Sequence, residues 1–222
     1  MARGALMTGG MRIAALFVVA VLGAALAACA HSQDSGAIST PHDNDEYSRL
    51  VAATEAGDTT VDFRALRLAW LESAARKGRA PIDGLTKTML QAAQARENAK
   101  VRDTARAILS IDYTNLAAHK YLRQACKILR EDSCSDHEHF VEFGLLRSIT
   151  TAGDGKSMQS AWKVISIDEE YFIMSMLDLR LEMQSLISDN GRAYDQMNVV
   201  DQDGAKKVLY FDISDFIGRE LQ

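Results

Sequence analysis

Apolar residues recur every three or four positions over most of the chain between residues 43 and 150. This spacing is typical of amphipathic helices, because positions three and four apart share one helix face. The pattern therefore predicts a helical half over residues 43–150. Four apolar stripes support it: Phe63, Leu66, Trp70, Leu71 and Ala74; Leu85, Met89 and Ala92; Val101, Ala105, Ile108 and Leu109; Leu116, Leu122, Ala125 and Leu129.

Local signals indicate where several of these helices begin and end. Asp62 is a predicted N-cap, and Gly78 with Pro81 is predicted to end the helix that follows it. A later helix is predicted from about Asp136 to Ile149, opened by Ser135 and Glu138 as a capping box.

The turn at residues 112–115 joins two predicted helices of similar length. Such pairs resemble the antiparallel helix pairs of tetratricopeptide-type repeats. A repeat array needs about three units, and one unit is clear, so a helical bundle without repeats is an equally good interpretation.

After Thr150 the apolar period changes from helical to strand-like. Asn190-Gly191 is the strongest hairpin signal, since both central residues of a type I′ turn have positive φ, and Asp203-Gly204 repeats it. Residues 168–177 are predicted to form a short helix, opened by Ser166 with Glu169. Strands are predicted at residues 161–166, 183–188, 193–200 and 207–213. The predicted fold class is therefore α+β, with a helical half followed by a small antiparallel meander at residues 151–222, both in one compact unit over 43–222.

Several segments carry a family resemblance: residues 57–67, 153–157, 161–171, 184–186 and 209–214. In order and spacing they resemble the domain-of-unknown-function 4919 (DUF4919) family, from about Asp43 to Ser214. The resemblance implies an exported bacterial protein, and it brings no assigned activity and no catalytic residue.

The first 29 residues resemble a bacterial lipoprotein signal. Arg3 and Arg12 precede an apolar run from Ile13 to Ala25, and Leu26-Ala27-Ala28-Cys29 resembles the lipobox. We expect residues 1–28 to be removed, Cys29 to carry lipid, and residues 29–42 to be a flexible tether. The alternative is an ordinary secretory signal. Ala30, in place of an aspartate, favours the outer membrane among the membranes of the bacterial envelope.

The chain has a net charge of −5, and removing residues 1–28 takes away two arginines and no acid, which leaves −7. This acidic balance argues against nucleic acid as a partner. The expected membrane contact is through the lipid on Cys29.

Cys126 and Cys134 are the two remaining cysteines after Cys29, and the exported compartment is oxidising. We expect them to form a disulfide, with two free thiols as the alternative. A metal site at residues 134–139 is disfavoured, because His137 and His139 are two positions apart on a predicted helix and point to opposite sides.

The loop Gly153-Asp154-Gly155-Lys156-Ser157 ends like a phosphate loop. However, the required earlier glycine is Thr150, and the loop follows a helix rather than a strand. We therefore expect a turn between the halves. No catalytic motif is recognisable, and no cofactor or metal is expected.

Two functions remain. The first is a non-enzymatic protein-interaction module of the envelope, with Tyr113, His119, Lys120 and Tyr121 beside a groove of the helical half. The alternative is a small-molecule binding protein or hydrolase, with Asp154, Lys156 and Glu170 at the junction of the halves.

Overall fold

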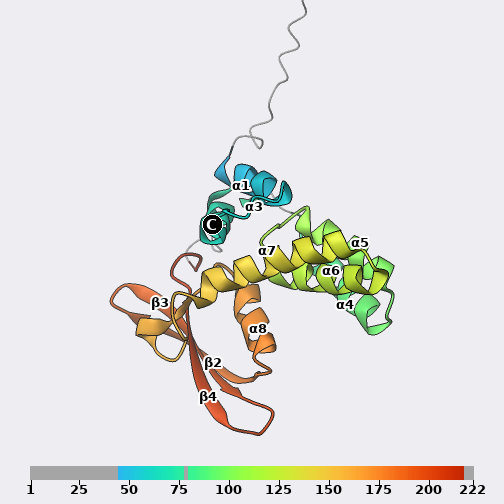
Figure 1. Ribbon diagram of the computed structural model, residues 1–222. Helices are drawn as coiled ribbons and strands as arrows, with labels where there is room; N and C mark the ends of the chain where they lie inside the picture. Colours follow the sequence, from blue (N-terminus) through green and yellow to red (C-terminus); the bar gives the residue numbers. More distant parts are fainter. Residues whose placement is uncertain (1–44, 78–79, 218–222) are drawn as a thin grey trace, which may run out of the picture. The chain divides into compact units, whose positions relative to one another are not determined.

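The computed structural model describes residues 45–77 and 80–217 of the chain, shown in Figure 1. The predicted signal peptide, the predicted lipid acceptor Cys29 and the predicted tether lie outside the described residues. The described residues all belong to one compact unit.

Seven α-helices precede the sheet in the described residues. They are α1 (Glu46–Glu55), α2 (Phe63–Glu72), α3 (Ala74–Lys77), α4 (Asp83–Gln94), α5 (Asn98–Leu109), α6 (Leu116–Leu129) and α7 (Asp132–Thr150). Helices α4 to α7 pack consecutively, each on the next. Their shared core contains Met89, Ala105, Ile108, Leu122 and Cys126. The predicted helical half is therefore present.

Capping confirms some predicted helix boundaries and corrects another. The Asp62 carboxylate accepts hydrogen bonds from the backbone N–H groups of Arg64 and Ala65, so Asp62 is the N-cap of α2 as predicted. The helix ends at Glu72, well before Gly78, because Ser73 is extended and its hydroxyl donates to the Trp70 carbonyl. The predicted end at Gly78 and Pro81 was therefore wrong.

Helix α7 begins at Asp132, four residues before the predicted start at Asp136. Arg130 ends α6 in the left-handed conformation, with φ of 62°, and the N–H of Glu131 returns to the Cys126 carbonyl. This tight turn leaves Glu131 as the N-cap of α7 and places Ser135 inside the helix. The predicted capping box at Ser135 and Glu138 is therefore absent.

Cys126 and Cys134 form a disulfide across this turn, with 5.9 Å between their Cα atoms. Cys126 is fully buried. For so short a loop, the chain-entropy model gives a stabilisation of about 2.5 kcal/mol. The disulfide therefore holds the end of α6 against the first turn of α7.

The sheet has four strands in the order β1-β4-β3-β2. Its elements are β1 (Trp162–Lys163), β2 (Arg180–Asp189), β3 (Arg192–Val200) and β4 (Lys206–Asp212), with the short helix η1 (Met158–Ser160) before β1 and α8 (Ile167–Met176) between β1 and β2. Strands β2, β3 and β4 are the predicted antiparallel meander. The predicted strand at residues 161–166 is reduced to β1, which pairs with β4 in parallel.

The two predicted turns of the meander have the expected backbone. Asn190 and Gly191 have φ of 49° and 77°, so both lie in the left-handed region that a type I′ turn requires. Gly204, in the second turn, also has positive φ. These local signals therefore fix the pairing of β2 with β3 and of β3 with β4.

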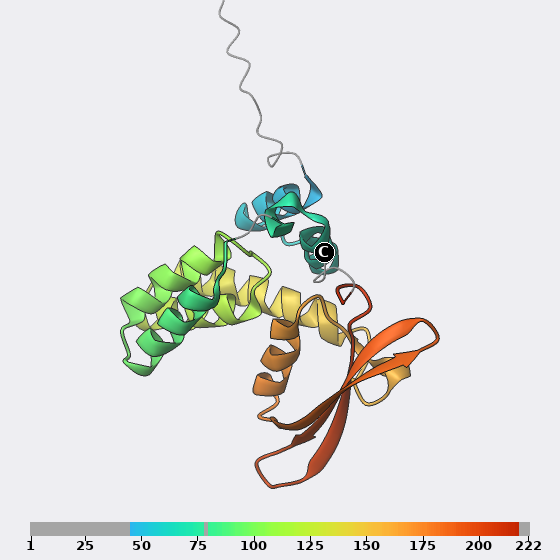
Figure 2. The ribbon, with the colours of Figure 1, turned by 180° about the vertical axis from the view of Figure 1, so that it is seen from behind.

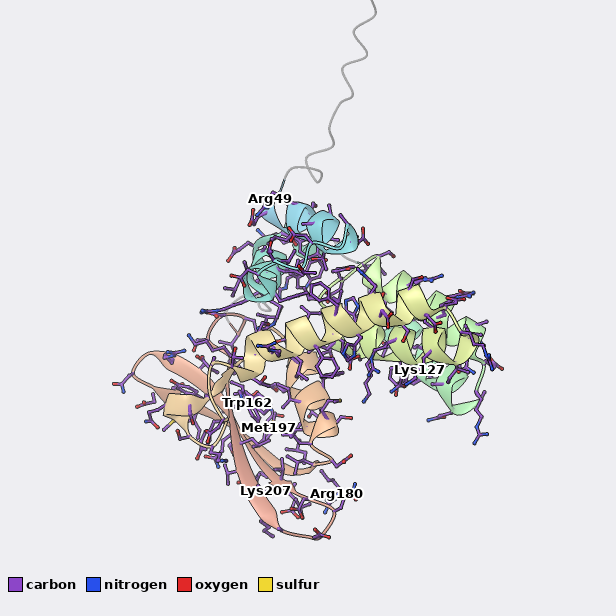
Figure 3. All side chains as sticks on the ribbon, in the orientation of Figure 1. Arg49, Lys127, Trp162, Arg180, Met197 and Lys207 are labelled. Carbon is purple, nitrogen blue, oxygen red and sulfur yellow. A yellow bond between two sulfur atoms is a disulfide. The ribbon has the colours of Figure 1, made fainter. Side chains whose placement is uncertain are left out.

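The larger apolar core joins α1, α2 and α7 to the sheet and α8. Its fully buried members include Leu66, Leu145, Ile149, Met197 and Phe211. Figures 1 and 2 both show α8 beside the sheet, and α8 contacts β2. Trp162 and Met197, labelled in Figure 3, belong to this core on the sheet side. Residues from both predicted halves therefore share one core.

The glycine-rich loop at residues 153–157 packs against the sheet. Gly155 has φ of 68°, and a Cβ there would lie 2.7 Å from the Trp162 ring. The Trp162 indole N–H donates to the Gly153 carbonyl, and the Tyr210 N–H donates to the Gly155 carbonyl. The loop is the expected turn at the start of the sheet.

Candidate functional site

Three helices line a groove with a volume of about 920 Å³. One wall is α4, the second is the start of α6 with the turn before it, and the third is α8. The N-terminal part of the chain adds Trp70 and Arg76. We call this the α4–α6–α8 groove.

Helix α4 contributes a stripe of residues that follows its helical period. Thr86, Lys87, Leu90, Gln91 and Gln94 line the groove, while Met89 and Ala92 are buried in the core on the other side of α4. Leu90 is a large apolar side chain left exposed on this stripe. The α4 wall is therefore mostly polar, with one apolar contact point.

Helix α6 contributes Lys120 and Tyr121, both half-buried. The Asn115 side chain caps α6 by accepting from the Ala118 N–H, which fixes the direction of the helix at the groove. The Lys120 ammonium lies 5.6 Å from the centre of the Phe172 ring on α8. A cation over an aromatic ring is attractive, so Lys120 holds the α6 and α8 walls together.

Helix α8 gives the groove its apolar wall. The Ser166 hydroxyl accepts from the Glu169 N–H, which confirms half of the predicted capping box. Phe172 and Ile173 are buried, yet another face of α8 carries apolar side chains that are exposed: Ile167 is 44% exposed and Tyr171 is 46% exposed. Ile167 and Tyr171 are four positions apart, so both exposed side chains lie on one face of α8.

A second cavity, of about 440 Å³, continues from the groove along α8. It shares Tyr171 and Ser175 with the groove and extends to the start of β2, including Arg180 and Leu181. The two cavities are therefore neighbours along α8.

A buried ion pair fixes α8 beneath the groove. The Arg67 guanidinium donates to both carboxylate oxygens of Glu169, at 2.7 and 2.6 Å. It also donates to the Ser148 hydroxyl on α7 and to the Lys163 carbonyl of β1. The Glu169 carboxylate further accepts from the Ile165 N–H. Glu169 lines the groove, but both of its carboxylate oxygens accept hydrogen bonds within the protein, so its role is to hold α8 in position.

The structure divides the predicted binding residues of the helical half. Lys120 and Tyr121 line the groove, whereas His119 is 0% exposed and Tyr113 is buried. The expectation that His119 and Tyr113 contact a partner therefore does not hold. Both residues lie at or near a polar turn, but their side chains are buried, so polar neighbours in the sequence do not indicate exposure here.

His119 instead joins α6 to α7. Its Nδ1 lies 2.5 Å from a Glu138 carboxylate oxygen, and its Nε2 lies 2.8 Å from the Tyr113 carbonyl. Because a carbonyl only accepts, Nε2 must carry a proton. Desolvation raises the pKa of the Tyr113 phenol, whose oxygen lies 3.2 Å from His137 Nε2.

The alternative residues at the junction do not come together in one site. Asp154 and Lys156 are exposed and ion-paired at 3.3 Å, and neither lines the groove. Hydrogen bonds from Ser160, first, and from Lys156 lower the pKa of Asp154 to about 2. Glu170 is fully buried, so it cannot contact a ligand in solvent.

Among the described residues, one cluster of three potential metal ligands exists: Cys126, Glu131 and Cys134. Its two sulfurs are joined in the disulfide, so they offer no thiolate. No described histidine or cysteine lines the groove. The groove is lined by hydroxyl, amide, carboxylate, ammonium and guanidinium groups and by apolar side chains. These groups can form hydrogen bonds, ion pairs and apolar contacts with a ligand.

Sequence reasoning missed Leu90, Ile167 and Tyr171 as site residues. Tyr171 is next to the buried Phe172 in the sequence, so its immediate neighbours do not distinguish its exposed side chain from the core. The available signal was the apolar spacing within α8, where Ile167 and Tyr171 are four positions apart and share a face that Phe172 and Ile173 do not occupy.

The fold is that of an α+β protein whose helices α4, α6 and α8 line a groove. Residues 42–221 match the family described as domain of unknown function (DUF4919), so the chain belongs to that family. Comparison with curated proteins and with solved structures found no match. Of the helices within the described residues, none has the length and apolar character needed to cross a membrane.

Proposed function

We propose that this protein is a bacterial cell-envelope protein, anchored by lipid on Cys29, that binds a segment of a partner protein in the α4–α6–α8 groove without catalysing a reaction. The proposed location is the periplasmic side of the outer membrane. The lipobox-like residues 26–29 support the anchor, and the acidic body supports a protein partner over nucleic acid.

The observation that carries the binding proposal is the exposed apolar wall of α8. The exposed side chains of Ile167 and Tyr171 can fill an apolar pocket of a partner or pack against an apolar side chain of the partner. The α4 wall offers the amides of Gln91 and Gln94 and the side chain of Lys87, which suit the carbonyl and N–H groups of a peptide backbone.

The length of the binding surface favours a polypeptide. The groove and the second cavity both border Tyr171 and Ser175, so a ligand that passes these residues along α8 would contact residues from α4 to the start of β2. An extended or helical segment can follow such a path, as in groove-binding peptides, whereas a compact ligand contacts one part of it.

A small-molecule binding protein or hydrolase of the envelope is the second candidate. It is favoured by the volume of the groove alone, about 920 Å³, since ligand pockets span roughly 300 to 1,000 Å³. In this case the ligand lies between α6 and α8, near Lys120, rather than near Asp154 and Lys156.

The proposal is tested by crosslinking the protein in cells, purifying it and identifying the partner that is recovered with it. Leu90→Ser and Tyr171→Ser remove exposed apolar surface from two walls, and Ile128→Ser removes as much from α6 outside the groove. After crosslinking in intact cells, the partner should be recovered with wild type and with Ile128→Ser, and lost with the two groove variants. Equal recovery with all four proteins contradicts the proposal. A small molecule that stays bound in native mass spectrometry, and is lost only in the groove variants, supports the second candidate instead.

A further inference from the structure

A third cavity, a groove with a volume of about 610 Å³, lies between α7 and the segment that leads into α2. It shares no lining residue with the α4–α6–α8 groove. We call it the α2–α7 groove. Its aromatic surface and its cations are brought together from elements far apart in the sequence.

The floor of the α2–α7 groove is aromatic. Phe63 and Phe140 pack edge to face, with ring centres 5.3 Å apart. Gly144 makes this possible, because a Cβ at that position would lie 2.2 Å from the Phe63 ring. Beside them the His139 and Phe143 rings lie 4.4 Å apart, and Phe143 is 41% exposed. A flat apolar group can therefore pack on Phe143.

Two arginines line the same groove. Arg64 belongs to the first turn of α2 and Arg147 to the last turn of α7, and both are exposed. Within the described part of the chain, neither guanidinium has a carboxylate within 4.0 Å. The one acid lining the groove, Asp62, already accepts from the N–H groups of Arg64 and Ala65.

We propose that the α2–α7 groove binds a small organic anion, a phosphate monoester or a carboxylate attached to a flat apolar group. A guanidinium presents parallel N–H donors that match two oxygens of a phosphate or carboxylate. Arg64 and Arg147 hold the anionic end, and Phe143 packs against the apolar end. This site is independent of the partner-binding groove.

The volume of the groove fits this ligand class, since pockets for small ligands span roughly 300 to 1,000 Å³. A phosphate monoester is present both on soluble metabolites and on the phospholipid phosphatidic acid. The experiment therefore includes one soluble and one membrane-borne source.

Phenyl phosphate is the soluble probe, titrated into the full chain carrying Cys29→Ser and followed by calorimetry. Saturable binding with one site is expected. Arg64→Gln and Arg147→Gln should each weaken it by about tenfold or more, the worth of one charge-assisted hydrogen bond. Phe143→Ser should weaken phenyl phosphate but leave inorganic phosphate unchanged, because inorganic phosphate has no ring.

Lys127→Gln is the matched control, since it removes one exposed cation from α6 outside the groove (Figure 3). All four variants lie at exposed positions, so their melting temperatures should match that of the parent chain. Equal affinity in Arg64→Gln and Lys127→Gln, or no saturable binding of phenyl phosphate, overturns the proposal.

Vesicles of phosphatidic acid in phosphatidylcholine then show whether the anion is soluble or carried by a membrane lipid. Sedimentation with these vesicles that is lost in Arg64→Gln and Arg147→Gln supports a headgroup as the natural anion. Binding of phenyl phosphate without sedimentation supports a soluble anion.

Discussion

Arg67 on α2 and Glu169 on α8 are 102 residues apart in sequence and form a bidentate ion pair, with both side chains at most 4% exposed. Arg67 also reaches α7 and β1, so one side chain joins four elements. The pair therefore fixes α8 where its exposed face becomes the apolar wall of the groove.

Arg67→Met should lower the free energy of unfolding by about 3 to 5 kcal/mol, because it leaves the Glu169 carboxylate buried without its cation. Urea denaturation measures this. Arg49→Met is the control, since the pair of Arg49 with Glu46 is exposed to solvent and contributes little to stability. The double variant Arg67→Met with Glu169→Leu should regain part of the loss. A loss below 1 kcal/mol in Arg67→Met shows that the pair does not fix α8.

Gly144→Ala in α7 should destabilise the protein even though alanine favours helices over glycine by about 1 kcal/mol. The added Cβ would lie 2.2 to 2.6 Å from three atoms of the Phe63 ring, and such overpacking costs about 1 to 3 kcal/mol. Gly84→Ala in α4 meets no atom within 4 Å and should stabilise by roughly 0.5 to 1 kcal/mol. Opposite signs in thermal denaturation are the expected outcome. A stabilised Gly144→Ala variant would mean that Phe63 packs elsewhere.

Asp154 gives a pH dependence whose direction follows from its pKa. Hydrogen bonds from Ser160 and Lys156 lower its pKa from 3.8 to about 2 in the folded protein. A lowered folded pKa contributes stability that is present above pH 3.8 and is lost as the pH falls toward 2. Asp154→Asn should therefore be less stable than wild type at neutral pH, and the difference should vanish near pH 2.

Carboxyl NMR titration checks the same group directly. Ser160→Ala removes the largest cause of the shift and should raise the pKa of Asp154 toward its ordinary value. A midpoint near 3.8 in the wild-type protein would show that the Ser160 hydrogen bond does not form in solution.

Local signals were enough to predict much of the fold. The Asp62 cap, the α5 and α6 stripes and the Asn190-Gly191 turn each depend on residues within a few positions, so the sequence displays them. The parallel pairing of Trp162 with Phe211 is different, because it joins segments that no short pattern connects. The predicted strand there was accordingly too long.

The candidate site was harder to predict for the same reason. Glu169 reads as a helix-start carboxylate, and only the fold brings Arg67 to it. His119 reads as an exposed polar residue, yet Glu138 and the Tyr113 carbonyl satisfy it inside the protein. Tyr171 and Leu90 become one surface only when α8 and α4 face the same groove.

The resemblance of residues 26–29 to a lipobox predicts that Cys29 carries lipid. Cys29→Ala should abolish labelling by a radioactive or clickable fatty acid, because the thiol is the acyl acceptor. The variant should remain uncut or become soluble, and Cys126→Ala with Cys134→Ala should still be labelled. Membrane fractionation then tests the proposed outer-membrane location. Retention of label in Cys29→Ala contradicts the anchor.

The most direct test of the binding groove is site-specific photo-crosslinking in living cells. A photoreactive amino acid is placed at Tyr171 or Leu90 in the groove, and at Ile128 as an exposed apolar position outside it. The proposal predicts one discrete protein adduct from Tyr171 and Leu90, absent from Ile128 and lost when Lys120→Glu is added. An adduct of equal yield from Ile128, or none from either groove position while the protein remains folded, contradicts it.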